Sequence, residues 1–157
     1  MNKPVAVIVS GYFSPLHVGH LDMIEAGAAL GDKLFVIVNN NDQQRAKKGQ
    51  VILDEQDRLR IVNALRAVDE AIIAVDDDRT VSQSLRVLAE KHTDHQLVFA
   101  NGGDRKPDFV PEAATCEEFG IDMVFDLGGS EKADSSSRIN MALGIETEAS
   151  APPSATT

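Results

Sequence analysis

The sequence predicts an α/β fold in which an open, five-stranded parallel sheet is covered by helices on both faces. Two observations support this prediction. Five short apolar runs, of the kind that form strands buried on both faces, recur along the chain. Segments with apolar residues at helical spacing lie between these runs, which is the pattern of repeated strand–helix–strand units.

The expected strands are short and rich in β-branched residues. The first is a buried run that stops at Ser10-Gly11, and the second is closed by a cluster of Asn and Asp residues that starts at Asn39. Asn101-Gly102 follows the fourth run in the same way. The five predicted strands cover residues 5–9, 34–38, 71–75, 97–100 and 123–125.

The expected helices combine periodic apolar residues with residues suited to helix ends. Asp54 and Thr80 are placed to cap the second and third helices at their N-termini. Gly31 and Gly120 follow the first and fourth helices, where glycine commonly ends a helix. The predicted helices cover residues 21–30, 54–67, 80–89, 111–119 and 135–143, which together with the strands gives a Rossmann-like architecture.

Composition narrows the class of protein. The 157 residues carry a net charge of -10, which argues against nucleic acid as a partner because phosphate backbones bind to excess Lys and Arg. No apolar run approaches the roughly 20 residues that span a bilayer, and no signal peptide is recognised, so a cytoplasmic protein without a membrane partner is expected. We expect one domain over residues 1–145 and a disordered tail over the polar, Pro-containing residues 146–157.

Glycines, amides and cations gather after the strands of this acidic chain. Ligands of open parallel sheets bind beyond the carboxyl ends of the strands, so these exits define one candidate anion site. The first exit holds His17 and His20, whose spacing places both rings on one side of a helix start. With Gly11 allowing a tight turn and Gly19 leaving the backbone uncovered, this segment predicts a triphosphate cradle. Half of a metal site, or two surface histidines, are the alternatives.

Residues 11–20, read as GYFSPLHVGH, resemble the HxGH signature of the cytidylyltransferase-like nucleotidyltransferase superfamily, and the resemblance extends over residues 5–141. Lys48 stands where these enzymes carry a lysine before the second helix. Further matches are the element around Arg58 (Glu-Gln-Asp-Arg), the Gly-Gly-Asp turn that ends at Asp104, and the serines from Ser135 that open the last predicted helix.

The resemblance implies transfer of a nucleoside monophosphate from an NTP to a small phosphorylated acceptor, with release of pyrophosphate. It favours CTP slightly over ATP, a polyol, sugar or amino-alcohol phosphate as acceptor, Mg2+ bound with the NTP, and a homodimer. The expected catalytic residues are His17, His20 and Lys48. Expected nucleotide-binding residues are Gly11, Tyr12, Phe13, Ser14, Gly19, Asp104, Ser135, Ser136 and Ser137. Arg58, Arg105 and Lys132 are expected to bind the acceptor or a phosphate.

Departures from the signatures leave the base and the acceptor open. Tyr12 and Ser14 stand where glycerol-3-phosphate cytidylyltransferases usually carry Thr and Asp, and residues 131–134 replace an Arg-containing lead-in to the serine element. A non-catalytic nucleotide-binding regulator on the same fold is the main alternative. A fragment related to class I aminoacyl-tRNA synthetases fits poorly with the acidic composition.

Several single residues have plainer interpretations. Lys48 could be a solvated loop lysine, with Lys47 as a weaker candidate for its role, and Arg58 could form a surface ion pair with Asp54 or Asp57. Other residues read as structural or solvated from the sequence alone. These are the acidic turn of residues 76–78, the surface residues His92 and His95, and the core residue Cys116.

Overall fold

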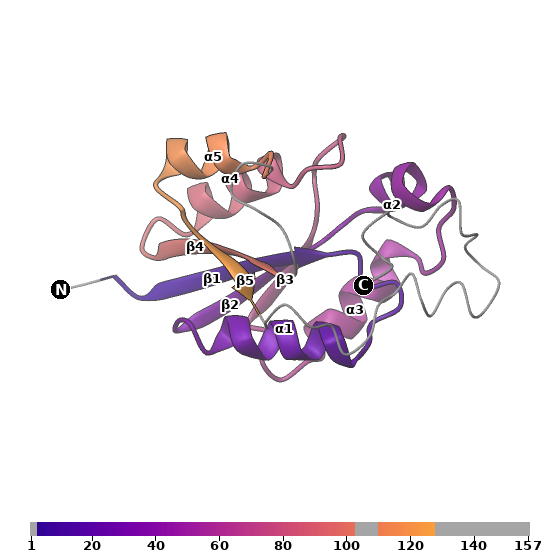
Figure 1. Ribbon diagram of the computed structural model, residues 1–157, viewed down its shortest axis with the longest axis horizontal. Helices are drawn as coiled ribbons and strands as arrows, with labels where there is room; N and C mark the ends of the chain where they lie inside the picture. Colours follow the sequence, from indigo (N-terminus) through magenta and orange to yellow (C-terminus); the bar gives the residue numbers. More distant parts are fainter. Residues whose placement is uncertain (1–2, 103–109, 128–157) are drawn as a thin grey trace.

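The computed structural model describes residues 3–102 and 110–127. Its sheet has five parallel strands in the order β3-β2-β1-β4-β5. The strand order reverses between β1 and β4, so a ligand is expected to bind beyond the carboxyl ends of these two strands. Figure 1 shows the sheet between its helices, with the α/β, Rossmann-like class confirmed. The strands are β1 (Val5–Gly11), β2 (Lys33–Val38), β3 (Glu70–Ile73), β4 (Gln96–Gly102) and β5 (Asp122–Leu127).

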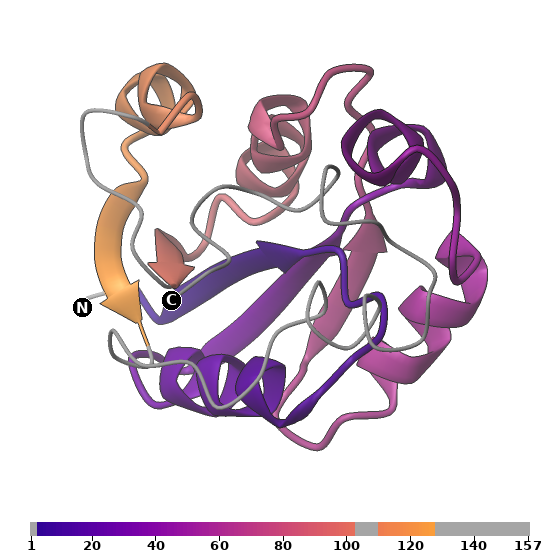
Figure 2. The same cartoon turned by 45° about the vertical axis from the view of Figure 1, so that its right-hand side comes forward.

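Helices cover both faces of the sheet, as predicted. Figure 2 shows α1 on one face and α4 and α5 on the other. Two separate groups of buried residues correspond to these two layers, one on each side of the sheet. The helices are α1 (Val18–Ala28), α2 (Asn41–Lys48), α3 (Glu55–Asn63), α4 (Ser82–Lys91) and α5 (Ala113–Phe119).

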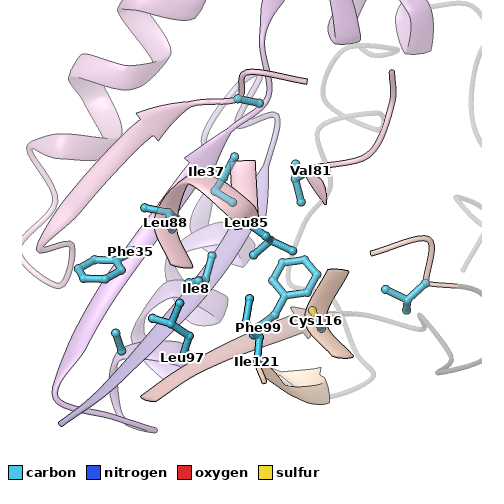
Figure 3. Packing of buried hydrophobic residues seen from close by; sticks show 13 residues of the cluster. Ile8, Phe35, Ile37, Val81, Leu85, Leu88, Leu97, Phe99, Cys116 and Ile121 are labelled. Atoms are coloured by element: carbon cyan, nitrogen blue, oxygen red, sulfur yellow. The ribbon is translucent and has the colours of Figure 1, made fainter. Parts of the chain in front are cut away.

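The central strand β1 is buried on both faces because its side chains alternate between the two layers. Ala6 and Ile8 belong to the cluster under α4 and α5, whereas Val7 and Val9 belong to the cluster on the α1 face. Figure 3 shows the first of these clusters, with Cys116 packed among the aliphatic and aromatic side chains. Burial raises the pKa of Cys116 to about 11, which agrees with a core role and not a nucleophilic one.

Helix α2 occupies a segment whose sequence suggested only a polar exit from β2. No apolar stripe marks it, and its start is fixed by polar capping. The Asn40 side chain accepts a hydrogen bond from the Gln43 amide at 2.9 Å, and the Gln43 side chain accepts one from the Asn40 amide at 2.9 Å. Gly49 ends the helix in the left-handed region, at φ 80°.

The N-terminus of α4 is capped by two side chains, of which the sequence predicted one. Thr80 is not the N-cap residue itself, which is Val81, but its hydroxyl accepts a hydrogen bond from the Ser82 amide at 3.3 Å. Asp76 accepts hydrogen bonds from the amides of Gln83 (2.7 Å) and Ser84 (3.1 Å). Asp76 is therefore buried, at 4% exposure, whereas Asp77 and Asp78 are solvated as expected. The solvated-turn interpretation is wrong for Asp76 because its carboxylate satisfies helix amides that would otherwise lack partners.

Other boundaries move by a few residues. Helix α1 begins at Val18 and not at Leu21, and its C-cap is Ala29 and not the expected Gly31. Helix α3 ends at Asn63. Helix α5 begins at Ala113 and is ended by Gly120, its C-cap residue, as predicted. Asp54 caps α3 as predicted, accepting from the Gln56 amide at 2.9 Å. The helix predicted over residues 135–143 and the tail over residues 146–157 lie outside the described residues.

Candidate active site

The exits of β1 and β2 lie side by side at the carboxyl edge of the sheet. Gly11 is paired with Val38, and the Asn39 amide donates to the Gly11 carbonyl at 2.9 Å. Figure 1 shows this edge together with α2 and the start of α1 at one end of the molecule. The structure thus brings together the first and second exits that the sequence singled out.

The loop after β1 is tightly packed. A side chain at Gly11 would meet the Phe13 ring at 3.0 Å, so glycine is needed for the close approach. Phe13 itself adopts φ 53°, a backbone conformation rare for a large residue and often found at functional sites.

Phe13 and Ser14 were expected to bind nucleotide, but their side chains are buried at 2% and 0% exposure. The Phe13 ring packs edge-on against His20, with 5.0 Å between ring centroids. Ser14 accepts a hydrogen bond from Gln44 at 3.3 Å. The side chains of Phe13 and Ser14 therefore pack inside the loop and do not line its surface, and the role of these two residues in nucleotide binding stays a prediction.

His17 and His20 form the N-terminal cap of α1. His17 Nδ1 accepts a hydrogen bond from the Gly19 amide at 3.1 Å, and His20 Nδ1 accepts one from the His17 amide at 3.2 Å. The two rings stack with 3.8 Å between centroids. The Gly19 amide is therefore committed to the cap, whereas the sequence suggested that it would face a phosphate.

This capping fixes the tautomer of both rings. A nitrogen that accepts a hydrogen bond carries a lone pair and no proton, so the proton of each neutral ring lies on Nε2. Each ring then connects a helix amide on one side to an Nε2–H donor on the other. The positive end of the α1 dipole is extended through His17 and His20, giving a pair of donors suited to an anion.

Lys47 and Lys48 lie on the last turn of α2. Lys48 is 8% exposed, so it is neither in a loop nor solvated, as its plainer interpretation required. The Lys47 ammonium lies over the Tyr12 ring at 4.5 Å from its centroid, a cation–π contact. Lys47, the weaker candidate by sequence, is the one of the two that lines the cavity described next.

A cavity of about 350 Å³ opens at the carboxyl edge. Two cations, Lys47 and Arg79, and one carboxylate, Glu112, contribute to its wall. Glu112 is 2% exposed, and its Oε2 accepts a hydrogen bond from the Val81 amide at 3.3 Å. The lining residues come from five segments of the chain: Ser10, Tyr12, Asn39, Lys47, Arg79, Val81 and Glu112.

Ser10, Arg79 and Glu112 were not identified from the sequence. Ser10 was read as the end of a strand, Arg79 lies in a turn that looked merely acidic, and Glu112 precedes a short helix. Only the fold brings these positions together, because the β3–α4 connection and the residues before α5 converge on the end of β1. A lone cation within the acidic run 76–79 was the available signal for Arg79.

Arg58 differs from both of its predicted roles. It is 0% exposed and donates to the carbonyls of Leu53 (2.8 Å), Tyr12 (2.9 Å) and Asn39 (2.5 Å). Its second terminal nitrogen donates to the Asn41 side chain at 3.1 Å. Arg58 is thus neither a surface ion pair nor a solvent-facing phosphate ligand. It ties both strand exits to the start of α3.

Burial lowers the pKa of Arg58, and the nearby carboxylates of Glu55 and Asp54 act in the opposite direction. The remaining predicted contacts lie outside the described residues: Asp104, Arg105, Lys132, Ser135, Ser136 and Ser137.

Comparison with known proteins defines the class to which this fold and site belong. A family model described as "Cytidylyltransferase-like" matches residues 8–140. The chain therefore belongs to the cytidylyltransferase-like family of nucleotidyltransferases, as the motif at residues 11–20 indicated.

Among its relatives is the bifunctional protein HldE of Koribacter versatilis, 34% identical over 76% of this chain and 23% of that protein. The FAD synthase of Natrialba magadii is 33% identical over 84% of this chain and 83% of that protein. The FAD synthase of Pyrococcus abyssi is 36% identical over 46% of this chain and 49% of its own length. The chain thus spans about a quarter of the bifunctional relatives and about half of some FAD synthases.

Solved structures agree with the fold. The lipopolysaccharide core biosynthesis protein of Thermoplasma volcanium superposes with a TM-score of 0.64 at 26% identity, covering 83% of this chain and 99% of that one. A bifunctional NMN adenylyltransferase/ADP ribose pyrophosphatase of Francisella tularensis, solved with AMP and a Mn ion, gives a TM-score of 0.62 at 14% identity, covering 93% and 43%. At that identity the second similarity bears on the fold alone.

No helix among residues 3–102 and 110–127 is both long and apolar enough to cross a membrane.

Proposed function

We propose that this chain transfers a nucleoside monophosphate from an NTP to a small phosphorylated acceptor and releases pyrophosphate. The observation that carries the proposal is the pair of capped imidazoles at the start of α1, next in the chain to a loop that lines a cationic cavity. Two oriented Nε2–H donors on a positive helix end suit the α-phosphate and the departing pyrophosphate.

The chemistry needs positioning and charge neutralisation more than a covalent intermediate. In-line attack by an acceptor phosphate oxygen on the α-phosphorus breaks the bond to pyrophosphate, and no protein nucleophile takes part. His17 and His20 would donate hydrogen bonds to oxygens on which charge grows in the transition state. Because their rings are already fixed by the cap and by stacking, little reorganisation is needed when the charge develops.

The cavity supports the acceptor assignment. Lys47 and Arg79 offer two positive charges for a phosphate, while Ser10, Asn39 and Glu112 offer groups that bind hydroxyls. A volume of about 350 Å³ lies in the range that holds a small metabolite. A phosphorylated polyol, sugar or amino alcohol carries both kinds of group.

Two observations bear on the identity of the donor nucleotide, and they favour different nucleotides. The signature motif favoured CTP slightly over ATP. FAD synthases, however, are named for a product that contains an adenylyl group, and several of them exceed 30% identity to this chain. That relationship supports ATP, so both nucleotides belong in the first assay.

We further propose that a divalent cation, Mg2+ as expected from the sequence, accompanies the nucleotide. Glu112 is the carboxylate of the cavity wall, and the group of three clustered ligand residues found in the described part of the chain lies elsewhere. The described residues therefore fit an ion held mainly by phosphate oxygens and water. When bound, such an ion neutralises triphosphate charge.

The test is pyrophosphate release with Mg2+, crossing CTP and ATP with a panel of phosphorylated polyols, sugars and amino alcohols. Release that requires one NTP and one acceptor establishes the transferase and both specificities. Tight NTP binding with no release for any pair would favour the alternative, a nucleotide-binding regulator.

A further inference from the structure

Two histidines and two carboxylates gather at the amino-terminal edge of the sheet, away from the candidate active site. His92 is the residue that ends α4, and Asp94 and His95 lie in the turn before β4. Glu70 is the first residue of β3. Figure 1 shows the α4–β4 turn at the end of the molecule opposite α2.

Three metal-binding groups converge in this turn. One potential ligand atom from each of His92, Asp94 and His95 lies within 4.8 Å of the other two. His95 Nδ1 is 2.8 Å from Asp94 Oδ1, and the two imidazole rings are nearly perpendicular with centroids 5.7 Å apart.

The histidines are held in place while the turn stays accessible. His92 stacks on Phe35 with 4.3 Å between ring centroids, and His95 meets the same ring edge-on at 6.1 Å. Their side chains are 17% and 14% exposed, so the two histidines lie at the surface as half-buried residues, more enclosed than the sequence suggested. Asp94 is 80% exposed and leaves the site open to solvent.

Glu70 contacts a ring nitrogen of His92, as a carboxylate commonly does beside a metal-binding histidine. Its Oε2 is 3.0 Å from His92 Nε2, and its Oε1 forms an ion pair with Lys91 at 2.5 Å. A carboxylate in this position orients the imidazole and makes it a better ligand, or joins the metal itself when Nε2 is the bound atom.

We propose that His92, Asp94 and His95, supported by Glu70, form a binding site for a divalent transition-metal ion such as Zn2+. Two imidazoles with carboxylate oxygens match the ligand preference of zinc, whereas Mg2+ and Ca2+ prefer oxygen ligands alone. Tetrahedral zinc places ligand atoms about 3.3 Å apart. The three candidate ligand atoms lie within 4.8 Å of one another, so a bound ion would draw them together by small side-chain adjustments. A bound ion would link the end of α4 to the start of β4 and, through Glu70, to β3.

The experiment is a titration of the metal-free protein with ZnCl2 by calorimetry, without nucleotide. The chain has four histidines, so His17 and His20 must be distinguished from the proposed ligands. Imidazole 15N NMR of the same samples does this, because four side chains give a spectrum that single variants assign. D94N removes a ligand at an exposed position and leaves the fold intact, and H95Q removes an imidazole. D77N, in an exposed turn outside the cluster, is the matched control.

We expect Zn2+ to shift the resonances of His92 and His95, with at least a 10-fold weaker affinity in D94N and H95Q and no change in D77N. Zn2+ should also raise the melting temperature of the wild type more than that of D94N. Three results would overturn the proposal: no binding at millimolar Zn2+, shifts confined to His17 and His20, or an affinity that D94N and H95Q leave unchanged.

Discussion

At the scale of single residues, the histidine pair does two jobs that separate substitutions can distinguish. Both Nδ1 atoms stabilise the first turn of α1, and the proton of each neutral ring therefore lies on Nε2, where it can be donated. Sequence spacing predicted that the two rings share one side of the helix. It could not predict the capping hydrogen bonds, because these depend on the extended backbone of His17, at φ -143° and ψ 177°.

Replacement of His17 by Asn should preserve the cap, because Asn is among the best N-cap residues, and should remove the Nε2–H donor of the imidazole. We expect kcat to fall on the order of 10²–10³-fold with a nearly unchanged melting temperature. H17A loses both functions, so its helix should also be destabilised by about 1 kcal/mol. Steady-state kinetics and thermal melts of the two variants provide the comparison. A KM effect without loss of kcat in H17N would contradict a transition-state role.

The cations of the cavity can be tested in the same way. K47A and R79A should each raise the KM for the acceptor roughly 10- to 100-fold, equivalent to about 1.5–3 kcal/mol for a charged hydrogen bond, with little change for the NTP. K33A, an exposed lysine at the opposite end of β2, is the control. Loss of activity in K48A with normal K47A would restore the role that the motif assigned to Lys48.

At the scale of secondary-structure elements, the pattern of apolar residues predicted the elements that form the core. It missed the features that depend on hydrogen bonds between polar groups. All five strands were found because buried parallel strands are nearly continuous apolar runs. Helix α2 was missed because it has no apolar stripe and depends on the reciprocal Asn40–Gln43 cap. The capping role of Asp76 was missed because its partners, seven and eight residues later, are defined only by the path of the turn.

Arg58 connects these elements, and its removal should destabilise the protein as a whole. R58A leaves the buried carbonyl of Asn39 and the part-buried carbonyls of Leu53 and Tyr12 without their donor, at up to about 1–3 kcal/mol for each unsatisfied group. We expect a loss of at least about 3 kcal/mol in urea unfolding, whereas R60A on the exposed side of α3 should change stability by less than about 0.5 kcal/mol. Equal effects of the two substitutions on stability would show that the hydrogen bonds of Arg58 do not hold the two strand exits and the start of α3 together.

At the scale of the whole molecule, two groups of polar side chains lie at opposite ends of the strands of one sheet. Cations and oriented donors lie at the carboxyl edge, and the histidine–carboxylate cluster lies at the amino edge. The sequence predicted the first edge because glycines and cations follow the strands. It did not predict the second, since residues 70 and 92–95 are far apart in the chain and are brought together by the path of α4 across the sheet.

The amino edge should make stability depend on acidity. Partial burial of Glu70 opposes ionisation, but hydrogen bonds from Lys91 and His92 outweigh it and hold the pKa of Glu70 below its ordinary value. A carboxyl whose pKa is lower in the folded state stabilises the protein above its unfolded pKa of about 4.3, and this contribution is lost as pH falls through the folded value.

We therefore expect the unfolding free energy to decline below pH about 4.5, and E70Q to flatten that decline. Urea unfolding from pH 7 to pH 3, in wild type and E70Q, measures both curves. Parallel curves would show that Glu70 contributes nothing to the acid sensitivity.

Because the histidine rings are hydrogen-bonded to backbone amides at the start of α1, a backbone measurement can report whether the candidate active site is occupied. The Gly19 amide is hydrogen-bonded to the His17 ring and not to another part of the helix. Its deuterium exchange rate reports how firmly that ring is held. An anion that engages the outer nitrogen strengthens the inner hydrogen bond by polarising the ring, so occupancy of the site slows the exchange of one glycine proton. Ligands could then be ranked by this proton alone, before any substrate pair has been found.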